Sequence, residues 1–401
     1  MDAYRTLDDL DVKGKRVLVR SDLNVPMKDG RVEDDERIAR TAPTIRELAE
    51  DGARVIVLSH FGRPKGKRVA EMSLKPVAPV LAKAVGRPVA FADDCIGEAA
   101  SAAVAKLKDG DVLLLENTRF HKGEEDNDRA FTKEVAALGD IFVNDAFSAA
   151  HRAHATTTGL AYLLPSAAGR AMQSELEHLH KALDDPKRPL MAVVGGAKVS
   201  SKIALLENLV KKVETLVIAG AMANTFLAAE GVAVGKSLYE PDHVETARRV
   251  IKLSTESGAA IILPIDVVVA KELKAGAAHR TAMRDDVKAD ETILDVGPKT
   301  IAEFGNRLQA TSTLVWNGPF GAFETPPFGE GTAAAAKLVA ERTKQGYLLS
   351  VAGGGDTVSA LNHAGVADDF SYVSTAGGAF LEWLEGQELP GVEALAASAR
   401  V

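Results

Sequence analysis

The sequence predicts an α/β protein of two lobes of similar size, each a parallel β-sheet covered by helices, joined by a helical connector. Short runs of β-branched residues and leucine recur along the 401 residues, and each run ends in polar or glycine-rich residues before a helix-like stretch. Strands that alternate with helices in this way form parallel sheets. A charged, proline-containing break falls near mid-chain. The length also favours two domains, at roughly 100–200 residues each.

The expected strands are continuous apolar runs, which are typical of strands buried on both faces of a sheet. They are residues 16–20, 54–58, 112–115 and 141–143 in the first half, and 190–194, 216–219, 261–263, 314–316 and 347–351 in the second. Residues 332–344 are typical of an amphipathic covering helix. In such folds ligands bind at the carboxyl ends of the strands, where the polar residues of this chain collect.

The break defines the expected domain limits. Leu176, Leu179 and Leu183 follow one another at helical spacing, and residues 184–189 contain two prolines and four charges. We therefore expect an amino-terminal lobe over residues 1–172, a connecting helix and linker over 173–189, and a second lobe over 190–385. Because the connector lies between two sets of motifs, we expect it to form part of a hinge.

The charge balance excludes two classes of partner. The chain has 48 Lys and Arg residues against 56 Asp and Glu residues, a net charge of −8. Such a balance argues against general binding to nucleic acids or to anionic membranes. Any anionic substrate must therefore find its positive charge locally.

Cysteine content and hydropathy predict a cytoplasmic protein without a membrane segment. The single cysteine, Cys95, excludes an internal disulfide framework and a cysteine-based zinc site, and it suits a reducing cytosol. The first residues lack the apolar run of a secretory signal. The longest uncharged apolar stretch, between Glu214 and Glu230, is shorter than the ~20 residues that span a bilayer. We interpret it as a buried strand followed by a helix.

Basic residues of the first half come just after the expected strands. They are Arg37, His60 with Arg63, Arg119 with His121, and His151, Arg152 and His154. Any one of them alone is explained as a solvated charge. Because the ends of parallel strands converge, however, the set indicates one anion-binding cleft, and guanidinium matches phosphate and carboxylate oxygens.

Asp22 and Asn24 follow the first expected strand and allow two interpretations. Both residue types favour turns, and Pro26 punctuates one here. The same pair could bind a hydroxyl group beside the basic cluster. The sequence pattern leaves these alternatives open.

The second half opens with a strand that runs into Gly195 and Gly196 and then into an expected helix, so that backbone N–H groups could point at a phosphate. Lys198 and Lys202 are four residues apart, which places like charges on one helical face. A bound polyphosphate would relieve their repulsion. They could equally be two solvated lysines on an ordinary first helical turn. Neither a Walker A motif nor a dinucleotide-binding glycine motif is present.

Three further turns in this half could meet a nucleotide. Residues 353–357 contain three glycines before Asp356, and spacing alone favours Asp356 as a helix N-cap over a ligand for a hard cation. Residues 374–378 again place glycines before a helix. Residues 316–324 form a turn-rich loop whose carboxylate, Glu324, could meet a ribose. Several such turns in one lobe, with several arginines in the other, indicate phosphate chemistry.

With these residues in view, the whole chain resembles the phosphoglycerate kinase family, whose motifs it keeps in order. The most specific are Arg20-Ser21-Asp22-Leu23-Asn24-Val25-Pro26, Ser59-His60-Phe61-Gly62-Arg63-Pro64, Leu115-Glu116-Asn117-Thr118-Arg119-Phe120, Asn144-Asp145-Ala146-Phe147 with His151-Arg152, Gly195-Gly196-Ala197-Lys198, Trp316-Asn317-Gly318-Pro319 and Gly353-Gly354-Gly355-Asp356-Thr357. The resemblance implies two Rossmann-like lobes with a hinge, and a carboxyl-terminal segment, residues 386–401, that returns to the first lobe. It also implies a monomer.

The resemblance further implies roles for individual residues. Binding of 3-phosphoglycerate or 1,3-bisphosphoglycerate would fall to Asp22, Leu23, Asn24, Arg37, His60, Phe61, Gly62, Arg63, Arg119 and Arg152. Binding of ADP or ATP with Mg²⁺ would fall to Lys198, Lys202, Gly297, Asn317, Glu324, Gly354, Gly355, Asp356 and Thr357, with Asp356 as the magnesium ligand in place of an N-cap. Stabilisation of the phosphoryl group in flight would fall to Arg37, Lys198, Gly377 and Gly378.

Three residues depart from the family pattern. Ala376 stands where the family has a first glycine, Phe380 where a serine is common, and Ser148 where a glycine is usual. We expect backbone N–H groups to preserve the anion site at the first two, and no catalytic consequence from the third. Two rival functions fit less well: a nicotinamide dehydrogenase should show a dinucleotide motif, and a non-catalytic anion-binding protein would not need Asp356 or the paired lysines.

Overall fold

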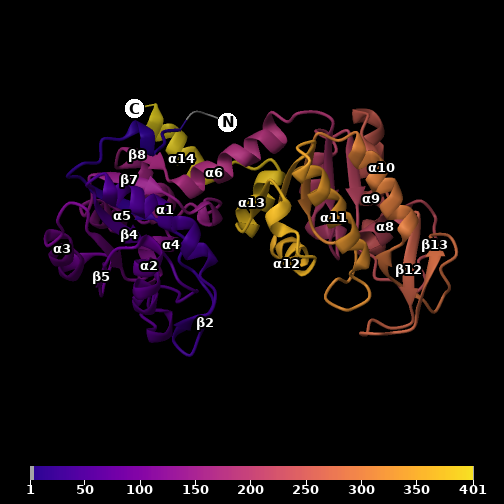
Figure 1. Cartoon of the computed structure of the whole chain (residues 1–401), viewed down its shortest axis with the longest axis horizontal. Coiled ribbons are helices and arrows are strands. Elements are labelled where there is room, and N and C mark those ends of the chain that lie inside the picture. The colour runs from indigo at the N-terminus through magenta and orange to yellow at the C-terminus, as the bar shows by residue number, and fades with distance from the viewer. Residues whose placement is uncertain (1–3, 401) are drawn as a thin grey trace. The chain divides into compact units, whose positions relative to one another are not determined.

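The computed structural model describes residues 4–400, which pack into two compact units (Figure 1). The first unit holds the described residues up to Glu177 together with those from Glu388 onward, and the second holds His178–Gln387. The expected limits lay at residues 172/173 and 189/190, so the division falls inside the expected connector. Among residues 4–400, no helix has both the length and the apolar character to cross a membrane.

The first unit is built on a parallel six-stranded sheet in the order β5-β6-β4-β1-β7-β8. Its strands are β1 (Arg16–Arg20), β4 (Arg54–Leu58), β5 (Val89–Ala92), β6 (Val112–Leu115), β7 (Ile141–Asn144) and β8 (Ser166–Ala168). The four expected strands are confirmed. The two missed strands are the sheet edges: β5 is half exposed, and β8 contains only serine and alanine, so neither shows a continuous β-branched run.

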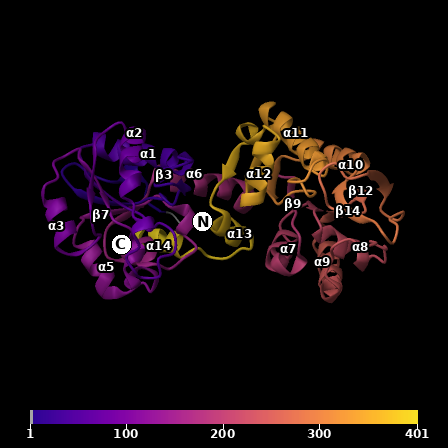
Figure 2. The ribbon, with the colours of Figure 1, turned by 90° about the horizontal axis from the view of Figure 1, so that it is seen from below.

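Helices cover both faces of this sheet (Figure 2). α1 (Glu36–Glu50) and α2 (Ala78–Val85) pack on one face, and α3 (Gly97–Ala105) and α5 (Arg129–Ala136) on the other. Because successive strand residues point to opposite faces, Val17 and Val19 join the first core and Leu18 joins the second. Full burial of one such side chain contributes about 1.5–3 kcal/mol.

The carboxyl-terminal helix α14 (Pro390–Ala399) belongs to the first unit, although α13 (Gly377–Leu384) belongs to the second. α14 packs on β8 and on a π-helical turn, Ala155–Gly159, and Ala394 is buried in the core. The N–H of Gly391 donates to the carbonyl of Ala150 at 2.8 Å. Hydrophobic periodicity alone gave no sign of this return, which only the family resemblance implied.

The second unit is built on another parallel six-stranded sheet, in the order β11-β10-β9-β15-β16-β17. Its strands are β9 (Leu190–Val194), β10 (Thr215–Ile218), β11 (Ala260–Ile262), β15 (Thr313–Asn317), β16 (Leu349–Gly353) and β17 (Tyr372–Ser374). All five expected strands are confirmed within two residues at each end. Only the short edge strand β17 was missed.

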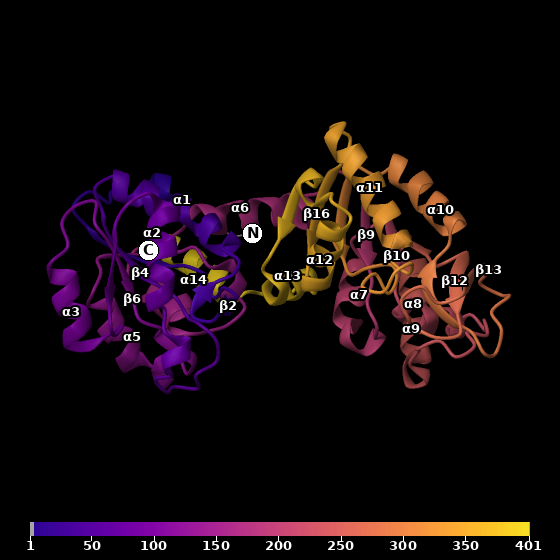
Figure 3. The ribbon, with the colours of Figure 1, turned by 60° about the horizontal axis from the view of Figure 1, so that its bottom comes forward.

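Figure 3 shows α7 (Ile203–Leu209), α8 (Met222–Ala229) and α9 (Val244–Ser257) on one face of this sheet, and α10 (Pro298–Gln309) and α11 (Glu330–Lys344) on the other. The core beneath α10 and α11 centres on Trp316, whose ring packs edge-on against Phe304 and Phe320. Two parallel sheets covered by helices confirm the predicted fold class.

Two antiparallel elements were not expected. β12 (Asp266–Ala270), β13 (His279–Met283) and β14 (Thr292–Val296) form a three-stranded sheet at the side of the second unit. In the first unit, β2 (Met27–Lys28) and β3 (Arg31–Val32) form a hairpin around Asp29 and Gly30, both with positive φ. Asp-Gly is a preferred sequence for such a turn. The expectation of parallel sheets alone was therefore incomplete.

The expected connector helix is present but starts earlier and changes its winding. α6 (Arg170–Leu179) runs directly into a π-helical turn, His180–Asp184. The carboxylate of Asp145 accepts hydrogen bonds from the N–H groups of Ala171 and Met172 at 2.9 and 3.2 Å, which satisfies the free donors at the start of α6. The helix therefore begins at Arg170 rather than at residue 173.

Candidate active site

The candidate substrate residues of the first unit follow β1, β4, β6 and β7, which are neighbours in the sheet. From β1 the chain passes to β4 on one side, and β7 later pairs with the other side of β1. In open parallel sheets this is the place at which ligands bind. The sheet order thus places the expected residues at one edge.

After β1, three expected residues form one hydrogen-bonded group. Arg37, on α1, donates from Nη1 to Asp22 Oδ2 at 3.2 Å and to the carbonyl of Asn24 at 3.0 Å. The Asn24 side chain accepts from the N–H of Gly62, and Leu23 is buried with its N–H on Ser59 Oγ. The turn expected of Asp22 and Asn24 is present, since Asn24 N–H donates to Asp22 Oδ1.

Ser148 joins this group, although the sequence suggested no role for it. It lies in a short 3₁₀ turn, Phe147–Ala149, just after β7, and its hydroxyl donates to Asp22 Oδ2 at 2.6 Å. A glycine in this position would leave the carboxylate without that donor.

After β4, the loop that holds His60, Phe61 and Gly62 is fixed by the loop after β6. The Asn117 side chain accepts from the N–H of Phe61 at 3.1 Å and donates to its carbonyl at 2.7 Å. Arg119 donates from Nη1 to the carbonyl of Gly62 at 2.9 Å, and its buried Nε has no hydrogen-bond partner but lies 3.7 Å from Glu125 Oε1. A buried, incompletely paired guanidinium fits a site for an anion.

The electrostatics show that the cationic groups gather. Burial is the main reason that the pKa of Arg119 is lowered, and the neighbouring Arg20 and Arg152 add to the effect. Burial also lowers the pKa of His60 well below its usual range, and Arg20, Arg119, His154 and Arg37 lower it further. Arg119, His60, Arg152 and Arg37 therefore lie in one positive field, as their positions after neighbouring strands predicted.

Two further expected basic residues are placed differently. Arg63 is exposed in the loop after β4. His121 turns away, with Nε2 2.6 Å from Asp94 Oδ1, and the Cys95 thiol completes a group whose ligand atoms lie within 4.8 Å of one another. Because Asp94 Oδ1 also accepts from the N–H of Cys95 and burial raises the thiol's pKa well above its usual range, hydrogen bonding explains this group.

In the second unit, the loops after β9 and β15 touch backbone to backbone. A Cβ on Gly195 would lie 2.1 Å from the carbonyl oxygen of Pro319, and one on Gly318 would lie 2.2 Å from that of Gly195. Such contacts are too close for any side chain, so both glycines are required.

The two lysines do not share a helical face, and that prediction was wrong. Lys198 is extended and exposed, a 3₁₀ turn covers Val199–Ser201, and α7 begins only after Lys202. Lys202 is instead partly buried, with Nζ on Asn317 Oδ1. Burial lowers its pKa, while the nearby carboxylate of Asp356 opposes the shift. β9 runs into Gly195 and Gly196 as expected, but the chain then forms a 3₁₀ turn in place of the expected regular helix.

The start of α12 (Gly355–His363) completes this pocket. Gly354 is the N-cap, with φ +100°, and Asp356 is the second helical residue, so the N-cap prediction for Asp356 was wrong. Asn317 donates to the carbonyl of Gly353 at 2.9 Å, and Thr357 Oγ1 accepts from the N–H of Gly318 at 2.7 Å. These bonds hold the loops after β15 and β16 together.

A cavity of about 360 Å³ lies among these loops. Its lining residues include Gly195, Gly196, Lys202, Asn317, Gly354, Gly355, Asp356, Thr357, Gly377 and Gly378. The last two open α13, as the sequence indicated. Lys198 does not line this cavity.

Two departures from the family pattern pack beside it. Ala376 is the N-cap of α13. Phe380 is fully buried directly under Gly353, where a Cβ would lie 2.5 Å from the Phe380 ring. The phenyl group therefore fills the space beneath the end of β16.

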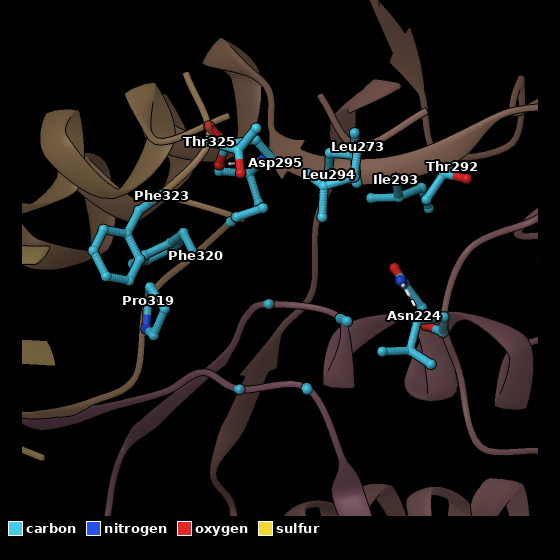
Figure 4. Close-up of a pocket in the computed structure, with 18 of the residues that line it drawn as sticks. Asn224, Leu273, Thr292, Ile293, Leu294, Asp295, Pro319, Phe320, Phe323 and Thr325 are labelled. Atoms are coloured by element: carbon cyan, nitrogen blue, oxygen red, sulfur yellow. Dashed lines mark hydrogen bonds between the residues drawn. The ribbon is translucent and has the colours of Figure 1, made fainter. Parts of the chain in front are cut away.

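A second, larger cavity of about 450 Å³ adjoins the first, because Gly196, Ala197, Pro319 and Asp356 line both. Figure 4 shows Pro319, Phe320 and Phe323 together on one side and Asn224 on another. Glu324 lines it as well, whereas Gly297 lines neither cavity and instead caps α10 against Asp266. An apolar cavity beside a glycine-rich one that contains Lys202 suits a base and its phosphates.

The residues at the junction fit a magnesium ion. Mg²⁺ prefers hard oxygen ligands and is commonly held by one carboxylate together with substrate phosphates. Asp356 offers an exposed carboxylate where the two cavities meet. The oxygen donors at this junction therefore suit Mg²⁺, and Asp356 is the residue that would hold it.

Comparisons with known proteins agree with this geometry. The family model described as phosphoglycerate kinase matches residues 7–387. Proteins named phosphoglycerate kinase from Methylobacterium radiotolerans and Rhizobium leguminosarum bv. trifolii are each 64% identical, over 99% of this chain and 100% of theirs. Among solved structures, phosphoglycerate kinase from Coxiella burnetii has a TM-score of 0.92 at 45% identity, covering 98% of this chain and 99% of that one. Phosphoglycerate kinase from Pyrococcus horikoshii has a TM-score of 0.82 at 30% identity, covering 99% of each chain. A match over nearly the whole chain, with the expected motifs gathered at the strand ends, shows that the chain belongs to the phosphoglycerate kinase family.

Proposed function

We propose that this chain catalyses reversible phosphoryl transfer from 1,3-bisphosphoglycerate to ADP, giving 3-phosphoglycerate and ATP. It is thus a phosphotransferase with a carboxyl group as acceptor and a kinase of glycolysis. The observation that carries the proposal is the family match over residues 7–387 together with two complementary strand-end sites, one cationic and one glycine-rich.

In this proposal the first unit binds the phosphoglycerate. Arg119 and Arg152, with the exposed Arg63, would meet its anionic oxygens, since guanidinium groups pair with phosphate and carboxylate in a fixed geometry. Asp22 and Asn24 would bind its hydroxyl group. Leu23, Phe61 and Gly62 would shape the site through the backbone, as their buried hydrogen bonds support.

The second unit would bind ADP or ATP. The apolar cavity suits the base, with Glu324 for a ribose hydroxyl, and the glycine-rich cavity with Lys202, Asn317 and Thr357 suits the phosphates. Mg²⁺ held by Asp356 would neutralise charge on the phosphate oxygens. The proposed nucleotide contact of Gly297 has the least support, because this residue lines neither cavity.

Catalysis would consist of positioning and charge neutralisation. An acyl phosphate is already activated, so in-line transfer needs no protein nucleophile. Arg37 and Lys198, with the N–H groups of Gly377 and Gly378, would stabilise the negative charge of the phosphoryl group in flight. Because donor and acceptor sites belong to different units, transfer requires the units to bring them together and exclude water, with α6 and residues 180–189 as part of the hinge.

A coupled assay that follows ATP formation from 1,3-bisphosphoglycerate and ADP tests the proposal. We expect magnesium-dependent activity that Arg37→Ala and Asp356→Ala each reduce by orders of magnitude. Lys252 on α9 is exposed and lines neither cavity of the second unit, so Lys252→Ala serves as a control and should retain full activity. A folded protein that binds phosphoglycerate but forms no ATP would instead support a non-catalytic anion-binding protein.

Two finer features are also proposed: the chain acts as a monomer, and it resides in the cytoplasm. The net charge of −8 favours a chain that stays monomeric, and the single buried cysteine suits a reducing cytosol. Light scattering coupled to size-exclusion chromatography should give the mass of one chain, 42.3 kDa. A concentration-independent dimer would refute the first of these features.

A further inference from the structure

Arg20, at the end of β1, is the one arginine among residues 4–400 whose side chain is fully buried. Its three donor nitrogens each meet a different acceptor: Nε donates to Thr156 Oγ1 at 2.9 Å, Nη1 to the carbonyl of Ser21 at 2.6 Å, and Nη2 lies 2.9 Å from His60 Nδ1. The third contact joins Arg20 to a residue of the proposed phosphoglycerate site.

The chemistry of guanidinium sets the direction of that contact. Arginine only donates hydrogen bonds, so His60 Nδ1 must be the acceptor and cannot carry a proton. A neutral imidazole with an unprotonated Nδ1 carries its hydrogen on Nε2. The groups around His60 agree, because burial and the charges of Arg20, Arg119, His154 and Arg37 all disfavour its cationic form.

A buried carboxylate fixes the arginine in turn. Glu124, fully buried on α4 (Lys122–Glu125), accepts from the N–H of Thr156 at 2.8 Å and from its hydroxyl at 2.6 Å. Because the single hydroxyl proton of Thr156 is committed to Glu124, Thr156 Oγ1 is free to accept from Arg20. Every hydrogen bond from His60 back to Glu124 therefore has one defined direction.

We propose that Arg20, held by Thr156 and Glu124, is a positioning residue that locks His60 as the neutral tautomer protonated on Nε2, so that His60 donates this N–H to an oxygen of bound phosphoglycerate. The inference rests on the proposed function and deepens it. His60 then adds a directed, uncharged donor to a site whose positive charge comes from arginines. A protonated, positively charged His60 would be in contact with the buried cation Arg20. Arg20 therefore disfavours the charged form of His60.

Long-range ¹H–¹⁵N NMR of the ¹⁵N-histidine-labelled full chain reads the tautomer directly, with His60→Gln used to assign the signal among the nine histidines. We expect an unprotonated Nδ1, a protonated Nε2 and no titration of His60 near the ordinary histidine pKa of about 6.5. A proton on Nδ1 of the wild-type protein, or titration of His60 near pH 6.5, would overturn the proposal, and this result needs no variant.

Variants test the lock itself. Arg20→Met removes the donor, so His60 should populate both tautomers and begin to titrate, and KM for 3-phosphoglycerate should rise about tenfold while KM for ATP stays unchanged. Thr156→Val and Thr156→Ser form a matched pair at a milder site, and only Thr156→Val should loosen the tautomer. A folded Arg20→Met or Thr156→Val protein with an unchanged His60 spectrum counts against the lock.

Titration with 3-phosphoglycerate separates the two levels of the argument. The ligand should shift the His60 Nε2–H signal. If the tautomer is as expected but the signal does not move at saturating ligand, the proposed substrate site is wrong and the positioning role of Arg20 stands. If the signal moves but the proton lies on Nδ1, the substrate site stands and the positioning role is wrong.

Discussion

Ser148 offers a sharp test of the proposed phosphoglycerate site, because it replaces the glycine usual in the family and contacts Asp22. Its hydroxyl donates to Asp22 Oδ2 at 2.6 Å, beside Arg37 at 3.2 Å from the same oxygen. Ser148→Gly restores the usual residue and removes this one donor. The remaining partners of Asp22, Arg37 and the N–H of Asn24, are untouched.

The structure sets the size of the effect. Hydrogen bonds to charged groups contribute about 1.5–3 kcal/mol. The Asp22 side chain is 15% exposed and keeps two other donors, which places the loss at the lower end. Because the bond also forms without substrate, only part of this energy can appear in binding. About 1.5 kcal/mol therefore sets an upper limit of a roughly tenfold rise in KM for 3-phosphoglycerate, since each 1.4 kcal/mol is about a factor of ten. We expect KM for ATP to stay unchanged.

Steady-state kinetics of Ser148→Gly, Asp22→Asn and the double variant measure this directly. Ser148→Thr keeps the hydroxyl and serves as the control. In the double-mutant cycle, the two substitutions should couple by about 1 kcal/mol, as contacting residues do. The reasoning is refuted if KM for 3-phosphoglycerate does not change in Ser148→Gly, or if the effects of the two substitutions simply add.

Three further predictions concern the second unit. Lys198→Ala should lower kcat by at least about a hundredfold with little change in KM, because a group that acts on the phosphoryl group in flight stabilises the transition state. A change in KM alone would show that Lys198 acts only in binding. Gly354→Ala should weaken ATP binding, measured by calorimetry, at least tenfold, because the φ of Gly354 is +100° and a Cβ there would lie 2.6 Å from Asn317 Nδ2. A Cβ on Gly355 meets nothing within 4 Å, so Gly355→Ala is the control and should bind ATP normally. Equal affinities of the two variants would contradict the loop geometry. Burial raises the pKa of Asp295 from 3.8 to about 7, so the folded chain keeps a proton that the unfolded chain releases. The free energy of unfolding should therefore fall, by up to about 4 kcal/mol from this carboxyl, as pH rises from about 4 to about 7. Asp295→Asn should show a smaller fall over the same pH range in urea unfolding. Equal pH dependence of stability in the wild-type and variant proteins would argue against this prediction.

Strand positions were the most predictable part of the fold. β1, β4, β9 and β15 are continuous apolar runs because they are buried on both faces, and each was found within a residue or two. Elements held by non-local contacts left no such pattern. β8 consists of Ser166–Ala168 and is held in the sheet by pairing with β7. α14 is held in the first unit by packing on β8. Neither interaction can be read from local periodicity.

In the candidate site, residue types were predictable but their geometry was not. Arginines after neighbouring strands indicated the anion site, since strand ends in a parallel sheet converge. Lys198 and Lys202 were misplaced because the 3₁₀ turn between them rotates the chain, and spacing arguments assume a regular helix. Ser148 was passed over because its partner, Asp22, is 126 residues away in the chain.

The net charge of −8 and the cationic site are reconciled by where the carboxylates lie. Glu124 is fully buried behind Arg20, and its charge acts on Arg20, Arg119 and His154, whereas the partly buried Arg37 faces Asp22. Each carboxylate offsets repulsion among the basic groups without covering them. Arg119 in turn has its Nε 3.7 Å from Glu125 Oε1, an ion pair without a hydrogen bond. The site therefore stays positive within an acidic protein because the carboxylates that balance its charge lie behind and beside the basic groups. Removing Glu124 should lower the free energy of unfolding more than removing any exposed acid.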